Sequence, residues 1–367
     1  MSKYLAHYAG SKRREGTQLE PARVTVLNDG GPGGRVRELL FKAVGLGFPI
    51  TERFKQMNFR LLHAHFGPDG VMALPLARRL RIPLVVTFHG YDATIKEAYA
   101  RKSYYTHRNY IRKRALLQRE GALFIAVSDF IRGKLIEQGF NPDKIIRHYI
   151  GVDTALFKPD PEVPRENIVL FVSRLVEVKG AAYLIRAMSE IQRELPDAEL
   201  VLIGDGPQRA ELEAMAASML TKYRFLGTQP PAVVQAWMNR ARVFSVPSVP
   251  LENGAEEAFG ISFLEAASMQ LPVASFRTGG IPEAVSDGET GLLSEPRDAR
   301  ALAADIRLLL TDEPLWQRMS MRGRERACES FDLIEQTREL ERIYHAVLAG
   351  DTRQETSYKL MPSPMDA

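Results

Sequence analysis

Short runs of apolar and β-branched residues alternate with longer amphipathic stretches along nearly the whole chain. The short runs of the first half lie at residues 24–27, 61–64, 84–88 and 123–127, and the amphipathic stretches between them include 70–80, 97–120 and 128–139. The short runs of the second half lie at residues 168–173, 199–203, 224–226, 243–246, 271–275 and 291–294. Strands that alternate with helices are typical of parallel sheets covered by helices, so the pattern predicts an α/β fold.

The alternation is interrupted once, near the middle of the chain. The pattern breaks around residues 151–153, and the sequence from Lys158 to Glu166 is polar and rich in proline, which is typical of a linker. With 367 residues, 45% of them hydrophobic, the chain is long enough to form two packed cores. We therefore expect an N-terminal domain at 1–150, a C-terminal domain at 151–349 and a disordered tail at 350–367.

The net charge of +4 hides an unequal distribution between the two halves. Residues 1–150 contain 26 lysines and arginines against 12 acidic residues, whereas the rest of the chain contains 23 basic and 33 acidic residues. A basic domain can bind an anionic membrane surface, and nucleic acid is a weaker alternative because no base-reading motif accompanies the charge. The candidate membrane patch comprises Arg101, Lys102, Arg108, Arg112, Lys113 and Arg114 with Tyr104, Tyr105 and Tyr110. The alternative is an ordinary solvated surface.

The cysteine content and the absence of long apolar segments bear on the location of the protein. Cys328 is the single cysteine, so the chain needs no oxidising compartment for an internal disulfide. No stretch approaches about 20 consecutive apolar residues, and the first 16 residues lack the apolar centre of a signal peptide. We expect a cytoplasmic protein that associates peripherally with the inner face of the cell membrane.

Two cations follow the first strand of the second half. Arg174 lies just past the run 168–173, and Lys179 lies five residues further on, before a predicted helix. Side chains at the carboxyl edge of a parallel sheet lie where such folds bind their ligands, and an arginine and a lysine there can converge on a diphosphate. The alternative is a pair of surface cations on a loop.

Two carboxylates lie eight residues apart in the densest polar segment of the second half. Glu257 lies in a predicted loop and Glu265 lies within the helix that follows. Eight residues span about 12 Å along a helix, so the two groups would contact different parts of one long ligand rather than form an acid/base pair. The alternative is that Glu257 caps the helix and Glu265 is solvated.

Histidines mark the carboxyl ends of two predicted strands in the first half. His89 follows the run 84–88 and precedes Gly90, so its imidazole could bind a hydroxyl or phosphate group of a ligand, although a structural role is the alternative. His63 and His65 have the spacing of metal ligands, but no acidic or cysteine partner nearby completes a set. We therefore expect no metal and no cofactor.

Six short motifs together resemble a known family. They are HAHFG at 63–67, TFHGYD at 87–92, SRLVEVKG at 173–180, GDGP at 204–207, Glu257 with Glu265, and GGIPE at 279–283. The chain resembles the glycosyltransferases of family 4, which have the GT-B architecture, and in particular those that build bacterial exopolysaccharides such as colanic acid. The resemblance implies two Rossmann-like domains with parallel sheets that face each other across a cleft, a nucleotide-sugar donor in the C-terminal domain and an acceptor in the N-terminal domain.

The resemblance also implies roles for individual residues. Arg174 and Lys179 would bind the donor diphosphate, and Glu257 would contact the donor sugar. The segment Phe259, Gly260 and Ile261 would lie along the sugar and phosphate, and Glu265 would hold the nucleotide ribose. His89 would reach toward the donor sugar from the other domain.

These inferences lead to a retaining, metal-independent glycosyltransferase that moves a sugar from a nucleoside-diphosphate sugar to a lipid-linked or other membrane-associated glycan acceptor. One alternative is a GT-B nucleotide-sugar epimerase, for which a basic acceptor domain would be unnecessary. Another is a protein that binds the donor without catalysis. The start of the chain departs from the family pattern, because residues 1–16 are more typical of the family's second strand than of its first.

Overall fold

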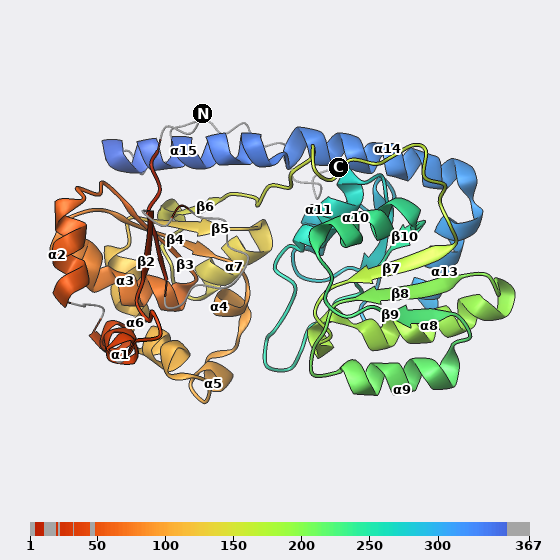
Figure 1. Cartoon of the computed structure of the whole chain (residues 1–367), viewed down its shortest axis with the longest axis horizontal. Helices are drawn as coiled ribbons and strands as arrows, with labels where there is room; N and C mark the ends of the chain where they lie inside the picture. Colours follow the sequence, from red (N-terminus) through yellow and green to blue (C-terminus); the bar gives the residue numbers. More distant parts are fainter. Residues whose placement is uncertain (1–3, 11–19, 21–22, 32, 45–47, 351–367) are drawn as a thin grey trace. The chain divides into compact units, whose positions relative to one another are not determined.

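The computed structural model describes residues 4–10, 20, 23–31, 33–44 and 48–350. These residues form two compact units (Figure 1). Among the described residues, unit 1 contains those up to 126, 132–148 and 338–350, and unit 2 contains 127–131 and 149–337. The chain therefore passes between the units more than once, although the sequence predicts a single division after residue 150. That division stays a prediction, and the tail expected at 350–367 lies almost entirely outside the described residues.

Unit 1 is built on a four-stranded parallel sheet of order β3-β4-β5-β6. Its strands are β3 (Leu62–His65), β4 (Leu84–Phe88), β5 (Leu123–Ala126) and β6 (Ile145–Arg147). A separate parallel pair is formed by β1 (Tyr8–Gly10) and β2 (Val24–Val26). The helices of this part of the chain are α1 (Gly34–Val44), α2 (Phe48–Gln56), α3 (Gly67–Leu80), α4 (Tyr91–Thr94), α5 (Glu97–Ala100), α6 (Tyr105–Glu120) and α7 (Asp129–Glu137), with a 3-10 turn η2 (Pro142–Lys144).

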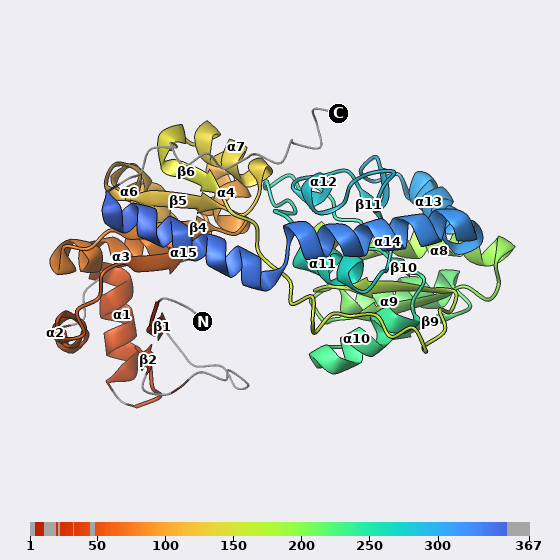
Figure 2. The ribbon, with the colours of Figure 1, turned by 90° about the horizontal axis from the view of Figure 1, so that it is seen from above.

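The last helix of the described chain contributes to the core of unit 1. In helix α15 (Leu333–Ala349), Ile343 and Val347 are buried against Val85 of β4 and Ile125 of β5. Figure 2 shows α15 lying across these strands. The sequence assigns this helix to the C-terminal domain because of its position in the chain, but its apolar face covers the sheet of unit 1 from Arg338 onward.

Unit 2 is built on a six-stranded parallel sheet of order β12-β11-β10-β7-β8-β9. Its strands are β7 (Ile168–Val172), β8 (Glu199–Ile203), β9 (Tyr223–Phe225), β10 (Val243–Phe244), β11 (Val273–Phe276) and β12 (Gly291–Ser294). The other helical elements are η3 (Glu177–Lys179), α8 (Ala181–Glu194), α9 (Arg209–Met219), α10 (Pro231–Arg240), α11 (Ile261–Ser268), α12 (Ile281–Ala284), α13 (Ala299–Thr311) and α14 (Glu313–Ser330). From β7 the next strands along the chain, β8 and β9, are added on one side, and β10, β11 and β12 are added on the other side. The topological switch point therefore lies between the neighbouring strands β7 and β10.

The α/β class with two Rossmann-like parallel sheets is confirmed, and most strands lie where the apolar runs predict them. Two local predictions are wrong. Strand β6 is missed, because its two apolar residues, Ile145 and Ile146, are followed at once by Arg147 and His148. The single helix expected over 97–120 is two helices, because the segment between Ala100 and Tyr105 leaves the helical conformation at Tyr104, which has φ −58° and ψ 155°.

Candidate functional site

The loops that follow β7, β10 and β11 approach one another closely at the carboxyl edge of the sheet in unit 2. Gly180 has φ +68°, and a Cβ atom there would lie 1.8 Å from the carbonyl oxygen of Pro247. Gly279 has φ +55°, and its Cβ would lie 2.0 Å from the carbonyl oxygen of Glu257. Only glycine permits both the left-handed backbone and this proximity. The two glycines therefore bring three loops together beside the switch point.

The two predicted phosphate-binding cations lie in the loop after β7. The backbone N–H of Leu175 donates to the carbonyl of Asp205 at 2.9 Å, which fixes the loop against the one that follows β8. Arg174 is exposed, and among the described residues its guanidinium has no hydrogen-bond or ion-pair partner. Lys179 ends η3, and its ammonium group forms an ion pair with Glu257. The structure thus leaves one cation available to a ligand and pairs the other.

Glu257 is held from two sides. Its Oε2 atom accepts from the Lys179 ammonium and from the hydroxyl of Ser248 at 3.1 Å. The side chains of Glu257 and Lys179 are only 11% and 19% exposed, so the ion pair is shielded from most of the solvent and is stronger than a surface pair. Ser248 is fully buried, and the sequence prediction missed it because its contact with Glu257 depends on the path of the loop.

The neighbouring Glu256 binds the loop after β11 rather than Lys179. Its Oε1 atom accepts from the hydroxyl of Thr278 at 2.8 Å and from the backbone N–H of Gly279 at 3.0 Å. The N–H of Gly280 in turn donates to the carbonyl of Glu257 at 2.9 Å. Glu256 therefore ties the loop after β10 to the loop after β11 and so fixes the backbone that carries Glu257.

The segment that follows Glu257 leads into α11. Phe259 is buried, and its ring stacks on that of Tyr149 with a centroid distance of 5.0 Å. Gly260, with φ +92°, forms the N-cap of α11, and Ile261 begins the helix with a side chain that is 41% exposed. Glu265 lies within α11, and burial raises the pKa of its carboxyl above the usual value. The two glutamates therefore do not share one helix, as the sequence predicts.

Glu283, the last residue of the GGIPE motif, binds the start of α7. Its two carboxylate oxygens accept from the backbone N–H groups of Asp129 at 2.7 Å and Phe130 at 2.9 Å, and one of them also accepts from the hydroxyl of Tyr149 at 3.1 Å. A carboxylate at a helix N-terminus satisfies donors that lack a partner within the helix. This motif residue thus has a structural task within unit 2.

His89 lies in unit 1, immediately after β4. Its Nε2 atom is 2.9 Å from Nδ1 of His65, and its ring lies 4.8 Å from that of Phe66. Burial, together with the neighbouring His65, lowers the pKa of His89 to about 4. The imidazole is therefore neutral at neutral pH and can act as one donor and one acceptor of hydrogen bonds.

His63 extends this row of imidazoles into the unit. Its ring stacks on that of His65 at 4.5 Å, its Nδ1 lies 2.6 Å from the hydroxyl of Tyr344, and its Nε2 lies 2.7 Å from the hydroxyl of Thr87. Burial is the main cause that lowers the pKa of His63 to about 3. Both ring nitrogens thus have protein partners, which suits a structural histidine.

Among the described residues, no group of three or more histidine, cysteine, aspartate or glutamate side chains is arranged to hold a metal ion. The same part of the chain contains no helix that is both long and apolar enough to cross a membrane.

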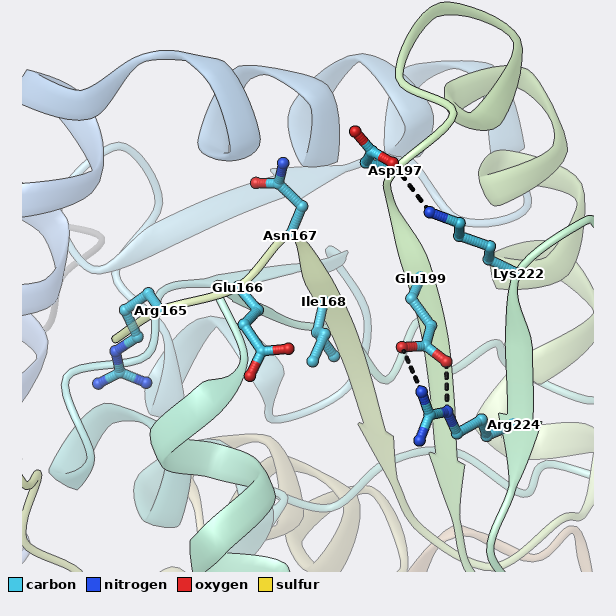
Figure 3. Close-up of a pocket in the computed structure, with 8 residues that line it drawn as sticks. All are labelled: Arg165, Glu166, Asn167, Ile168, Asp197, Glu199, Lys222 and Arg224. Carbon is cyan, nitrogen blue, oxygen red and sulfur yellow. Dashed lines mark hydrogen bonds and ion pairs between the residues drawn. The ribbon is translucent and has the colours of Figure 1, made fainter. Parts of the chain in front are cut away.

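A hollow of about 570 Å³ lies elsewhere on unit 2, and its side chains are drawn in Figure 3. It is lined by Arg165, Glu166, Asn167, Ile168, Asp197, Glu199, Lys222 and Arg224. Ile168 and Glu199 are the first residues of β7 and β8, so this hollow lies at the amino edge of the sheet, opposite the predicted site. Arg224 pairs with Glu199, Lys222 with Asp197, and Glu166 with Arg240 outside the hollow, while Arg165 donates to backbone carbonyls, and we assign the hollow no ligand.

Comparison with protein families covers most of the chain. Residues 8–156 match the model described as Glycosyltransferase Family 4, and residues 153–326 match the model described as Glycosyl transferases group 1. The chain is 30% identical to WcaL of Escherichia coli, described as a colanic acid biosynthesis glycosyltransferase, over 77% of this chain and 70% of that protein. The chain belongs to glycosyltransferase family 4. Enzymes of this family retain the anomeric configuration of the transferred sugar.

Two further relatives match a smaller share of their own length than the WcaL of Escherichia coli does. This family 4 chain is 33% identical, over 56% of its own length and 57% of the relative's, to a GDP-mannose-dependent phosphatidylinositol monomannoside mannosyltransferase of Mycolicibacterium smegmatis. It is also 30% identical to WcaL of Salmonella typhimurium, over 73% of its own length and 66% of that protein. The matched part thus spans between about half and two thirds of the length of these two relatives.

Solved structures share the GT-B fold with this family 4 chain. A crystal structure of Anabaena HepE in complex with UDP and glucose superposes with a TM-score of 0.71 at 21% identity, covering 88% of this chain and 86% of that one. The sucrose-phosphate synthase of Thermosynechococcus elongatus superposes with a TM-score of 0.72 at 24% identity, covering 91% and 86%. The expected family and architecture are confirmed, whereas the roles expected of individual residues stay predictions.

Proposed function

We propose that this family 4 glycosyltransferase moves a sugar, with retention, from a nucleoside-diphosphate sugar to a lipid-linked or other membrane-associated glycan acceptor in polysaccharide biosynthesis. The observation that carries the donor half of the proposal is the group formed by Arg174, Lys179 and Glu257 beside the switch point of unit 2. It combines an available guanidinium, an ammonium and a carboxylate, which suit a diphosphate bonded to a polyhydroxylated sugar. The names of WcaL and of the mycobacterial mannosyltransferase favour a glycan or glycolipid acceptor.

In this proposal the unpaired guanidinium of Arg174 binds the diphosphate first. A phosphate that reaches Lys179 competes with Glu257 for the ammonium group, which frees the Glu257 carboxylate to accept a hydroxyl of the donor sugar. Phe259, Gly260 and Ile261 line the sugar and phosphate. Glu265 accepts hydrogen bonds from the ribose hydroxyls through its carboxyl oxygens.

The chemical step is an attack on the same face of the sugar from which the phosphate leaves. The acceptor oxygen forms a bond to the anomeric carbon, the bond between that carbon and the phosphate oxygen breaks, and the acceptor proton passes to the leaving phosphate. Arg174 and Lys179 stabilise the negative charge that grows on the diphosphate, which is commonly the largest contribution to catalysis. His89 is neutral because its pKa is about 4, so it would serve as a hydrogen-bonding partner of the sugar rather than as a cation.

The peripheral membrane association rests on the charge of the first 150 residues and on the surface of α6. Tyr104 is 81% exposed and Tyr105 is also exposed, but Tyr110 is 2% exposed and packs inward, so it is removed from the proposed patch. Arg101 and Arg114 both pair with Glu97, which reduces the charge available to a membrane. Each remaining basic group near an anionic surface contributes about 1 kcal/mol, and the proposal places the protein in the cytoplasm at the inner face of the membrane.

Transfer to a glycolipid acceptor tests the function directly. The purified chain is incubated with UDP- and GDP-sugars and with polyprenyl-diphosphate-linked monosaccharides, and the lipid products are separated from free sugar. We expect transfer with at least one pair. Epimerised donor without transfer would support a nucleotide-sugar epimerase, and donor binding in calorimetry without either product would indicate a catalytically idle protein.

Sedimentation with liposomes tests the membrane association separately. Binding should require anionic lipid and should fall as salt screens the charges. The triple substitution of Arg112, Lys113 and Arg114 by glutamate should weaken it. Sedimentation that is indifferent to lipid charge, salt and these substitutions would remove the membrane from the proposal.

A further inference from the structure

Phe66, between β3 and α3 in unit 1, has an unusual backbone conformation. Its φ is +74° and its ψ is 141°. Such angles are costly for a residue with a bulky side chain, and they persist only where the surrounding structure imposes them. Strained backbone of this kind is concentrated at sites where ligands bind.

The hydrogen bonds around Phe66 impose this conformation. The backbone N–H of Phe66 donates to the carbonyl of Thr87 at 2.8 Å, and the N–H of the next residue, Gly67, donates to the Asp92 carboxylate at 2.9 Å. Asp92 is buried and also accepts from the N–H of Gly90 at 3.0 Å. The turn that carries Phe66 is thus bound to the loop that carries His89.

Packing of the Phe66 side chain does not compensate for this strain. The side chain is 44% exposed although it is a large apolar group. Its ring lies 4.8 Å from that of His89, with 47° between the two planes. The fold therefore uses a strained residue to hold an aromatic ring in the solvent, beside the histidine predicted to contact substrate.

We propose that Phe66 is a specificity-determining residue of the acceptor site and that its ring packs against the C–H face of a six-membered polyol ring, either a pyranose or a cyclitol. The electron-rich face of an aromatic ring attracts the weakly positive hydrogens of such a ring, and the exposed ring of Phe66 offers such a face. This inference rests on the proposed function, because it names the kind of acceptor that the glycosyltransferase takes. An acceptor without such a ring gains nothing from the aromatic face.

Three substitutions separate this role from a structural one. Phe66→Gly removes both the strain and the ring, Phe66→Leu keeps the strain and an apolar side chain without aromaticity, and Phe66→Tyr keeps the aromatic face. The matched control is Arg81→Gly, because Arg81 at the C-cap of the same helix α3 also has a left-handed backbone, with φ +56°. Both glycine variants should keep or raise the melting temperature, since glycine adopts positive φ without strain.

Binding of simple rings is measured by NMR titration with methyl α-D-glucopyranoside, methyl α-D-mannopyranoside, myo-inositol and, as a ligand without a ring, L-malate. We expect at least one ring compound to bind, with a dissociation constant that rises tenfold or more in Phe66→Gly and Phe66→Leu but changes less than threefold in Phe66→Tyr and Arg81→Gly. Equal affinity of the wild type and Phe66→Leu for every ring, tighter binding of malate than of any ring, or a lowered melting temperature of Phe66→Gly would each overturn the proposal.

UDP and GDP titrations of the same variants keep this result separate from the proposed function. Nucleotide binding should not change in any Phe66 variant, because the residues predicted to bind the diphosphate and the ribose all lie in unit 2. If no nucleotide binds to the wild type, the proposed function fails while the ring titrations still decide whether Phe66 binds a polyol.

Discussion

Replacing His63 by glutamine should make unit 1 less sensitive to acid. The His63 imidazole is enclosed between Tyr344 and Thr87, and burial, with His65, His89 and His148 nearby, lowers its pKa from 6.5 to about 3. In the unfolded chain the same group titrates near its ordinary value. Between these two pKa values the unfolded state therefore binds more protons than the folded state, so stability falls as the pH falls.

The size of this effect follows from the two pKa values. The contribution of the neutral His63 imidazole to the free energy of unfolding is fully present above about pH 6.5. It is lost progressively as the pH falls toward 3, at about 1.4 kcal/mol for each pH unit well inside that window. By pH 5 the loss due to His63 is about 2 kcal/mol, and its limit, reached below pH 3, is about 5 kcal/mol. Both Tyr344 and Thr87 can accept hydrogen bonds from a protonated ring, so the loss comes from burying the charge.

Hydrogen exchange provides the assay, because unfolding of a chain with two units is not a single two-state transition. The exchange rates of amides in β4, where Val85 and Val86 are fully buried, report the free energy of opening unit 1. After correction for intrinsic exchange, the opening free energy of the wild type should fall by about 2 kcal/mol more between pH 7 and pH 5 than that of His63→Gln. The matched control is His345→Gln, because His345 lies on α15 but is exposed.

The comparison concerns the change with pH rather than the stability at pH 7, since glutamine can alter packing at any pH. If the wild type and His63→Gln lose the same free energy between pH 7 and pH 5, the buried neutral imidazole is not the origin of the acid sensitivity. If His345→Gln reduces the pH dependence of the opening free energy as much as His63→Gln does, the effect comes from removing any histidine charge rather than from burial of His63.

The remaining predictions concern the donor site. Glu257→Gln should abolish transfer while nucleoside diphosphates still bind, because its carboxylate competes for the Lys179 ammonium rather than holding phosphate; equal losses of turnover and nucleotide affinity would contradict this role. Arg174→Ala and Lys179→Ala should each weaken nucleotide binding and turnover together, by about 1.5–3 kcal/mol for a lost charged hydrogen bond, and calorimetry that finds unchanged affinity in both variants would disprove the diphosphate site. Transfer should continue in EDTA, since two cations can stabilise the diphosphate in place of a metal, and activity that returns only with magnesium or manganese would refute metal independence.

The sequence alone determined the α/β class and the identity of most strands. Runs such as 84–88 and 199–203 are short, apolar and bounded by polar turns. Such a run is enough to identify a central strand of a parallel sheet, because helices cover both faces of the sheet and nearly every side chain of the strand must therefore be apolar. The placement of Arg174 and His89 just after strands was also predictable, because the parallel strands of a sheet have their carboxyl ends at the same edge.

Other features depend on contacts between residues far apart in the chain, and only the tertiary structure decided them. The apolar face of α15 is visible in the sequence, but nothing local shows that Ile343 covers Val85. The pairing of Lys179 with Glu257 joins residues 78 positions apart. The positive φ of Phe66 is invisible in a sequence pattern, since it is imposed by Thr87 and Asp92 through hydrogen bonds that exist only once β3 and β4 lie side by side. Local patterning specifies which segments become strands and helices, whereas the ion pairs and the strained turn arise from the way the loops meet.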